Sequence, residues 1–247
     1  MKIDHSRKWL TLIVALFLIS NILQAKPIRV LVITGGHAYK TEPFNQMLDG
    51  LGKGISCKVV SFPDAYSSFL PENRHQYDVL VFYHMWQKIT EEQAKAFADC
   101  IREGKPLVVL HHSICAFDDW PEYINIIGGK YFHKPTFVNG KEYAACTYKH
   151  DLTIPIKVVD PKHPVTKGVK DFELFDEVYH GYYVSPEATP LLTTNEPNGS
   201  PILGWTKKYG KSQVVTIQSG HDTPTFGNPV FRKLLKQSIE WVFKKSK

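Results

Sequence analysis

Three short apolar runs in the first half of the chain, each ending abruptly, constrain the fold more than any other feature. They span residues 28–33, 78–82 and 107–110, and they end at Gly35-Gly36-His37, Tyr83-His84-Met85-Trp86 and His111-His112-Ser113. Short runs of Val, Ile and Leu that stop at glycine or polar residues are typical of strands buried in a parallel sheet. We therefore expect a sheet whose inner strands are covered on both faces.

Helical patterns separate these runs. Residues 42–51 carry an apolar helical face, and Thr90 begins a helix that runs to about Arg102 with a capping-box pattern. A further strand is expected at 57–62. The order strand, helix, strand, strand, helix, strand predicts an α/β fold with a doubly wound, mostly parallel sheet flanked by helices, in three layers.

The second half of the chain is less regular. Its pattern predicts a short helix at 119–127, strands at 143–148, 154–159, 190–194 and 214–217, and a final amphipathic helix over 231–242. There are no internal repeats and no low-complexity linker. Residues 26–247 are therefore expected to form a single domain.

The N-terminal segment reads as a targeting sequence. Lys2, Arg7 and Lys8 precede an apolar run over residues 9–22, and Ala25 follows as a small residue. This pattern predicts a signal peptide at residues 1–25 and an exported, periplasmic protein. If the segment is not cleaved, it would tether the protein to the membrane.

Charge and cysteine content narrow the class of protein further. The formal net charge is +6, but the lysines and arginines are scattered and no nucleic-acid-binding module is present, so no nucleic-acid partner is expected. The four cysteines, Cys57, Cys100, Cys115 and Cys146, do not form the dense framework of a small disulfide-rich fold. We interpret them as free, buried thiols.

The ends of the apolar runs predict where a ligand binds. Ligands of open α/β sheets bind beyond the carboxyl ends of the strands. His37, Trp86 and His111 follow three such ends, so they should lie on the same side of the sheet. No G-x-G-x-x-G spacing follows the first strand, and a dinucleotide cofactor is therefore not assigned.

Several segments, in order along the chain, resemble the ThuA-like (trehalose utilisation) family. They are Gly104 to His111, Gly128-Gly129 with His133, His163-Pro164-Val165, Asp176-Glu177-Val178-Tyr179, and Gly210 to Val215 leading to Gly220-His221-Asp222. The resemblance implies a fold similar to class I glutamine amidotransferases, a flavodoxin-like three-layer sandwich. It also implies a role with trehalose or related sugars, often as 3-keto derivatives made by a partner sugar dehydrogenase.

Amidotransferase chemistry itself is not expected. Those enzymes carry a nucleophilic cysteine at a tight turn after a central strand, whereas the corresponding residues here are Leu110-His111-His112-Ser113. Cys115 lies slightly further on, and the glycines that such a turn usually requires are absent. Hydrolysis through Cys115 or Ser113 remains as a third hypothesis, testable with a thiol reagent.

The candidate site residues follow from the strand ends and from the resemblance. Asp176 and Glu177 are adjacent, so in a strand only one of them faces a pocket, and the resemblance favours Glu177 with Tyr179. His150 and His163 read as ordinary loop residues. The candidate catalytic residues are His37, His111, Glu177, Tyr179 and His221, and the candidate substrate-binding residues are Trp86, His112, His133, His180 and Asp222.

Two chemical uses of this cluster stay open. Imidazoles with one carboxylate suit zinc or a similar divalent ion, with His37, His111 and His221 as candidate ligands. The same groups also suit metal-free acid–base catalysis. Aromatic residues such as Trp86, Tyr83 and Trp205 could stack on a sugar ring. The leading hypothesis is a hydrolase or isomerase acting on a glycoside or keto-glycoside, and the alternative is a non-catalytic carbohydrate-binding protein.

Overall fold

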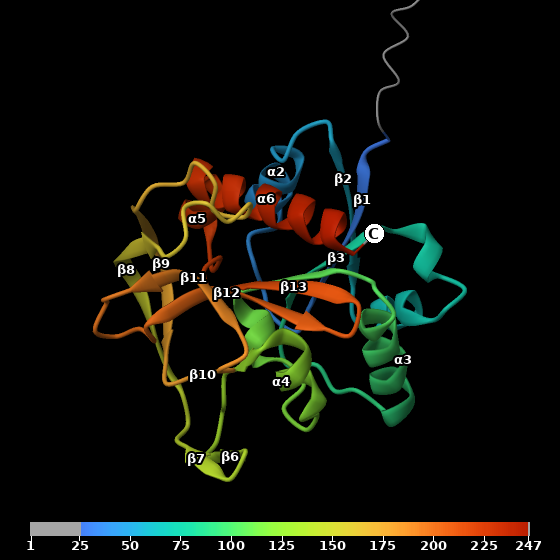
Figure 1. Cartoon of the computed structure of the whole chain (residues 1–247), viewed down its shortest axis with the longest axis horizontal. Helices are drawn as coiled ribbons and strands as arrows, with labels where there is room; N and C mark the ends of the chain where they lie inside the picture. The colour runs from blue at the N-terminus through green and yellow to red at the C-terminus, as the bar shows by residue number, and fades with distance from the viewer. Residues whose placement is uncertain (1–25, 247) are drawn as a thin grey trace, which may run out of the picture.

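A computed structural model describes residues 26–246, whose main element is a nine-stranded mixed sheet (Figure 1). The strand order is β2-β1-β3-β4-β13-β12-β11-β8-β9. The predicted signal peptide, residues 1–25, lies outside the described residues. No helix within residues 26–246 combines the length and the apolar character needed to cross a bilayer.

The first five strands of this order are parallel. They are β2 (Ile55–Ser61), β1 (Ile28–Gly35), β3 (Val79–His84), β4 (Leu107–Leu110) and β13 (Ser212–Ile217). Every residue of β3 and β4 is buried. Strands buried on both faces have no polar side to show, which is why these runs read as continuously apolar in the sequence.

The other four strands pair antiparallel, which makes the sheet a mixed one. They are β12 (Ile202–Tyr209), β11 (Thr189–Thr194), β8 (Thr147–Val158) and β9 (Phe172–His180). A tight turn with Gly210 at φ 56° joins β12 to β13, and a short turn can connect only antiparallel neighbours.

The strands expected at 143–148 and 154–159 are arranged differently in the structure. One long strand, β8, runs from Thr147 to Val158 and includes the end of the first range and most of the second. Residues 141–143 instead form β7 (Lys141–Tyr143), which pairs with β6 (Thr136–Val138) in a separate hairpin. A second two-stranded sheet joins β5 (Gly129–Lys130) to β10 (Tyr183–Val184).

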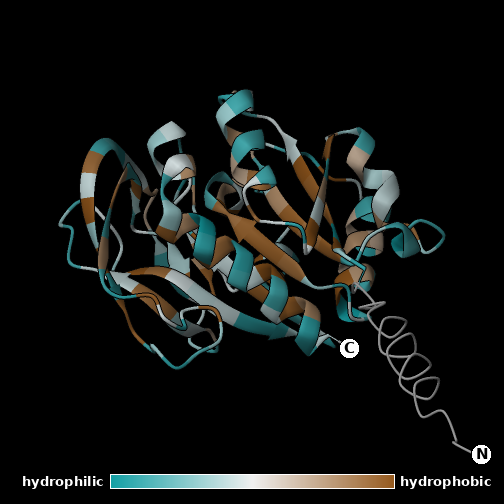
Figure 2. Ribbon diagram, turned by 90° about the horizontal axis from the view of Figure 1, so that it is seen from above, coloured by the Kyte–Doolittle hydropathy of each residue, from teal (hydrophilic) through white to brown (hydrophobic). Residues whose placement is uncertain are grey.

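Helices cover both faces of the large sheet (Figures 1 and 2). On one face lie α2 (Thr41–Asp49), α5 (Thr223–Gly227) and α6 (Pro229–Lys245), and on the other lie α3 (Glu91–Arg102) and α4 (Glu122–Ile127). Short 3-10 helices, η1 (Asp64–Phe69), η2 (Arg74–Gln76) and η3 (His111–Cys115), complete the connections. The predicted three-layer α/β sandwich is confirmed.

The cap of α3 and the state of the cysteines agree with the sequence, whereas the position of Trp205 does not. Thr90 caps α3 through a capping box with Gln93, as the sequence indicated. All four cysteines are free thiols, three of them buried and Cys57 half-buried. Trp205, in contrast, is fully buried and donates its indole N–H to the Ile127 carbonyl at 2.8 Å, so it cannot stack on a sugar.

Residues of β9 contact the segment that follows the carboxyl end of β13. Although β9 is the last strand in the sheet order, Asp176 accepts the Gly220 N–H at 2.8 Å. The Gln218 side-chain amide donates to the Glu177 carbonyl at 3.2 Å. These hydrogen bonds bring residues of β9 to the same edge of the sheet as His111 and His221.

Candidate functional site

A cavity of about 310 Å³ lies at this edge of the sheet. It gathers imidazoles, phenols and a single carboxylate from strand ends that are distant in sequence. Its lining residues are His37, Met85, Trp86, His112, Cys115, Tyr131, His133, Tyr148, His150, Glu177, Tyr179 and His221. A larger groove of about 430 Å³ runs along α3, but it is lined by helix-surface residues and has no comparable cluster of imidazoles.

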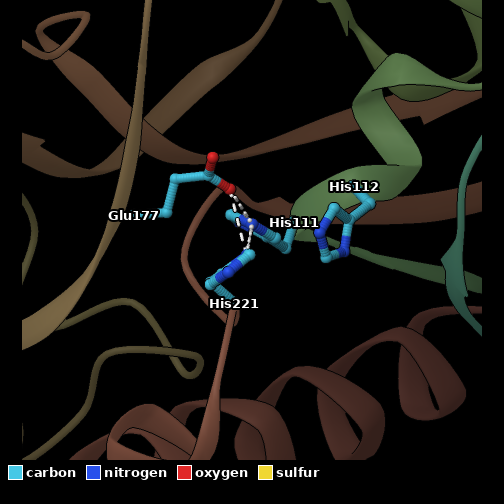
Figure 3. Close-up of side chains that lie close together, drawn as sticks. All are labelled: His111, His112, Glu177 and His221. Carbon is cyan, nitrogen blue, oxygen red and sulfur yellow. Dashed lines mark hydrogen bonds and ion pairs between the residues drawn. The ribbon is translucent and has the colours of Figure 1, made fainter. Parts of the chain in front are cut away.

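His111, Glu177 and His221 form a triangle of polar atoms (Figure 3), in which Glu177 and His221 line the cavity and His111 is buried behind them. His111 Nε2 lies 2.8 Å from Glu177 Oε2 and 3.2 Å from His221 Nδ1. His221 Nδ1 lies 3.1 Å from the same Glu177 oxygen. Three side chains from three different elements therefore converge within hydrogen-bonding distance of one another.

The backbone places His111 at the turn directly after β4. Its φ is 44°, a left-handed conformation that is uncommon for a residue with a side chain. A sharp turn after β4 is thus present without glycines, and it carries an imidazole. The ring is fixed by the Gln218 carbonyl, which lies 2.5 Å from Nδ1.

His221 is held through its backbone. Asp176 accepts the Gly220 N–H and, at 2.9 Å, the His221 N–H, while Tyr83 donates its hydroxyl to the His221 carbonyl at 3.2 Å. Asp176 points away from the cavity, as the alternation of β9 requires. Burial raises the pKa of Asp176 even though these N–H groups oppose the effect.

Glu177 and His221 stabilise each other's charged forms. Burial favours the neutral carboxylic acid, but the hydrogen bonds with His111 and His221 outweigh burial and lower the pKa of Glu177. Burial likewise favours neutral His221, yet its bond with Glu177 raises the pKa of His221 above the usual value. The floor of the cavity thus holds a carboxylate that is ionised at neutral pH.

His37 and His112 form a stacked pair on one wall. Their ring centroids are 4.0 Å apart. Burial, reinforced by neighbouring imidazoles, lowers the pKa of His112 well below its usual value and lowers that of His37 to a lesser extent. Burial therefore favours the neutral form of both rings, more strongly for His112 than for His37.

Aromatic residues form the rim of the cavity. Trp86 is 54% exposed and stacks on His133 with a centroid distance of 4.0 Å. Tyr148, 61% exposed, lies on the rim as well. An exposed indole above a polar floor is suited to contact with the apolar face of a sugar ring.

His150 belongs to the cavity, although the sequence indicated an ordinary loop residue. Its Nε2 lies 3.3 Å from Glu177 Oε1. The register of β8 against β9 shifts between Lys149 and Leu152, and Asp151 has φ 59°. This bulge turns His150 toward Glu177, and no sequence pattern marked it.

Two residues expected to bind substrate lie elsewhere. His180 is exposed on the face of β9 opposite Glu177 and Tyr179, with its Nδ1 3.3 Å from the Gly199 carbonyl. Asp222 caps α5 and lines a neighbouring surface hollow with His37 and His221. The other expected residue of β9, Tyr179, lies inside the cavity, with its hydroxyl 3.0 Å from His111 Nε2.

Neither candidate for nucleophilic catalysis has the required environment. The fully buried Ser113 hydroxyl donates to the His84 carbonyl and accepts the His84 N–H, so it clamps the turn to β3. Cys115 lines the cavity, but burial raises the pKa of its thiol far above the usual value. A thiol without an activating base is a poor nucleophile at neutral pH.

Comparisons with known proteins agree with this architecture. The chain matches the model of the family described as ThuA, trehalose utilisation, over residues 29–242. No curated protein matches it.

Solved structures show the same fold. A putative ThuA-like protein from Parabacteroides merdae has a TM-score of 0.71 at 22% identity, covering 88% of this chain and 90% of its own. One from Bacteroides uniformis has a TM-score of 0.64 at 18% identity, covering 88% and 92%. A putative GMP synthase protein from Thermoplasma acidophilum has a TM-score of 0.53 at 12% identity, covering 87% and 93%, as expected of an amidotransferase-like fold.

Proposed function

Because the chain belongs to the ThuA family, whose description is trehalose utilisation, we propose that it is an enzyme that cleaves a keto-glycoside in the cavity above His111, Glu177 and His221. The supporting observation is the kind of acid–base groups that line the cavity. Several imidazoles surround one carboxylate. This set of groups favours cleavage of a keto-glycoside over direct hydrolysis of an unmodified glycoside.

Direct hydrolysis of an unmodified glycoside is poorly served by this set. Most glycosidases use two carboxyl groups, one on each side of the scissile bond. Among the described residues that line the cavity, Glu177 is the single carboxylate. A second acid of matching position is absent from that lining, so a mechanism with one acid and several imidazoles fits better.

A keto-glycoside needs only such groups. A ketone acidifies the hydrogen on the neighbouring carbon, and a base of near-neutral pKa can remove it. The electron pair then forms a carbon–carbon double bond as the glycosidic C–O bond breaks. The leaving oxygen takes up a proton, and water adds across the double bond, so that the net reaction is hydrolysis.

The geometry suggests a role for each wall. His37 is accessible from the cavity and its neutral form is favoured by burial, which suits the base that removes the carbon-bound proton. Glu177 and His221, which line the cavity and contact His111, would hydrogen-bond a hydroxyl group of the substrate. Trp86 on the rim would contact the second sugar ring.

Product release from a 3-keto-disaccharide tests this proposal. The purified protein should release a hexose and a keto-hexose, detected by mass spectrometry. Glu177→Gln and His37→Gln should each reduce turnover at least ~100-fold. The matched controls are Glu173→Gln, at an exposed position of the same strand, and His163→Gln, at a residue that packs on Trp241 and does not line the cavity.

Saturable sugar binding without product would favour the alternative, a carbohydrate-binding accessory protein. The exposed rim of Trp86 and Tyr148 is the observation on which that alternative rests. Export to the periplasm is part of the main proposal and is supported by the pattern of residues 1–25 alone. N-terminal sequencing of the protein from a periplasmic fraction would test it.

A further inference from the structure

The tautomer of His111 is determined by its surroundings. Its Nδ1 lies 2.5 Å from the backbone oxygen of Gln218, and a carbonyl oxygen can only accept a hydrogen bond. Nδ1 therefore carries a proton. In the neutral ring, Nε2 then presents a lone pair toward Glu177 and His221. A backbone carbonyl that fixes one ring nitrogen while the other faces a site is typical of histidines that bind metals.

The contact between His111 and Glu177 requires a proton or a metal ion between the two atoms. Nε2 and the Glu177 oxygen are 2.8 Å apart, and both are acceptors when the ring is neutral. His221 Nδ1 lies 3.2 Å from the first atom and 3.1 Å from the second. An extra proton on His111 and a metal ion make different experimental predictions.

The three atoms also have the spacing of metal ligands. Ligands about 2.0–2.1 Å from one ion lie about 3.3 Å apart in a tetrahedron and about 2.9 Å apart at right angles. The observed separations of 2.8, 3.1 and 3.2 Å fall around this range. An ion about 2.0–2.1 Å from each atom would lie roughly 1 Å from the plane of the triangle.

Neighbouring groups hold these ligands in place. His150 lies 3.3 Å from the second oxygen of Glu177, and Asp176 fixes the His221 backbone. His112 brings a ring nitrogen within 4.8 Å of the other three ligand atoms (Figure 3). Its Nε2 is buried without a hydrogen-bond partner among residues 26–246, which is costly unless a ligand is nearby.

We propose that His111 Nε2, His221 Nδ1 and Glu177 Oε2 bind one divalent first-row metal ion, with zinc preferred over magnesium. Two imidazoles and one carboxylate form a ligand set that suits zinc, manganese or ferrous iron, whereas magnesium and calcium prefer oxygen ligands. Ion binding at these three residues is proposed independently of the reaction described above. The role of the ion in catalysis, which rests on the proposed function, would be to polarise the substrate's ketone oxygen at an open coordination position.

Metal titration of the purified protein tests this inference without any substrate. After chelator treatment and dialysis, calorimetry with Zn²⁺, Mn²⁺ and Mg²⁺ should show one site per chain, with Zn²⁺ tightest and Mg²⁺ weakest. Glu177→Gln and His221→Asn should weaken Zn²⁺ binding more than ~100-fold, since even groups that only orient ligands contribute 10–100-fold. Circular dichroism would verify that each variant is folded.

Two control variants test whether the loss of Zn²⁺ binding is specific to the proposed ligands. Tyr179→Phe removes the hydroxyl beside His111 Nε2 without removing a ligand and should change Zn²⁺ affinity less than tenfold. His163→Gln should leave it unchanged. The Co²⁺-loaded protein should lack a thiolate-to-cobalt absorption band, because Cys115 is not a ligand.

The inference is overturned if the folded wild type binds no divalent ion, if it binds one equally well after both ligand substitutions, or if cobalt shows thiolate ligation. Loss of metal binding with intact cleavage of a keto-disaccharide would reject the metal and retain the proposed function. Metal binding without any cleavage of the keto-disaccharide would retain the metal site and reject the proposed function.

Discussion

Asp176 and Glu177 hold His221 from two sides, although the two carboxylates point to opposite faces of β9. Asp176 accepts the backbone N–H of His221 at 2.9 Å, and Glu177 Oε2 lies 3.1 Å from its ring Nδ1. One acidic pair in the last strand of the sheet thus fixes both the backbone and the ring of a histidine that follows β13. Each carboxylate can be tested separately.

Replacement of Asp176 by Asn should damage the site although Asp176 itself does not line the cavity. Asn keeps one acceptor oxygen but turns an amide NH₂ toward a backbone N–H, so one of the two hydrogen bonds from Gly220 and His221 is lost. We expect a loss of about 1–3 kcal/mol in the free energy of unfolding, as for a buried donor left unpaired. Urea denaturation measures this loss, and turnover should fall as His221 moves.

The matched control is Asp171→Asn. Asp171 also accepts a backbone N–H, that of Val158, but at an exposed position. It should cost less stability and leave turnover unchanged. Full activity in Asp176→Asn would show that the backbone of His221 needs no such support.

The thiol of Cys115 should be inert although it lines the cavity. Because burial raises its pKa, little thiolate exists at neutral pH, and alkylation by iodoacetamide should be much slower than that of a free cysteine in solution. Mass spectrometry of the native and the urea-unfolded protein measures the difference. A Cys115→Ala variant that loses all turnover would revive thiol catalysis.

The indole of Trp86 should contribute to substrate binding and not to the chemical step. Trp86→Ala is expected to raise KM about tenfold and to leave kcat within about twofold, since stacking contributes roughly 1–1.5 kcal/mol. Phe137→Ala removes another exposed aromatic ring that does not line the cavity and serves as the control. A fall in kcat with unchanged KM would place Trp86 in a different role.

The ion pair between Arg29 and Asp78, which links β1 to the start of β3, should give a pH-dependent contribution to stability. The hydrogen bonds that the Arg29 side chain donates to Asp78 lower the pKa of the Asp78 carboxyl. A carboxyl whose folded-state pKa is lowered stabilises the fold above its unfolded-state value of about 3.9, and this contribution is lost as the pH falls through the folded-state value.

Because Arg29 is half-exposed, the contribution at pH 7 should be only about 0.5–1 kcal/mol. Urea denaturation of the wild type and Asp78→Asn measures it, and the difference should shrink between pH 5 and pH 2. The exposed Asp64 offers a control substitution, Asp64→Asn. A difference that grows on acidification would contradict the assigned pair.

The parallel half of the fold could be predicted from the sequence because its strands are buried on both faces. Continuous apolar runs such as residues 79–82 and 107–110 leave no ambiguity about burial. The strand β12 was missed because Gly204, Lys207 and Lys208 interrupt its apolar pattern. Its hydrogen bonds to β11 and β13, and not its composition, make it a strand.

The site was predictable where it lies at strand ends and unpredictable where it depends on tertiary contacts. His37, His111 and His221 follow buried strands, so their convergence follows from the topology of the sheet. His150 is directed by a bulge in β8 toward Glu177, which only the pairing of β8 with β9 reveals. His180 was misplaced because the alternation of β9 was not carried one residue past Tyr179.

The most direct test of the central claim is hydrogen exchange at the carbon beside the ketone of a 3-keto-disaccharide. The protein and the substrate would be incubated in D₂O and followed by NMR. The account predicts enzyme-dependent cleavage, with deuterium incorporated at that carbon, reduced at least ~100-fold in Glu177→Gln but not in Glu173→Gln. Cleavage without any deuterium at that carbon, or equal rates in both variants, would contradict it.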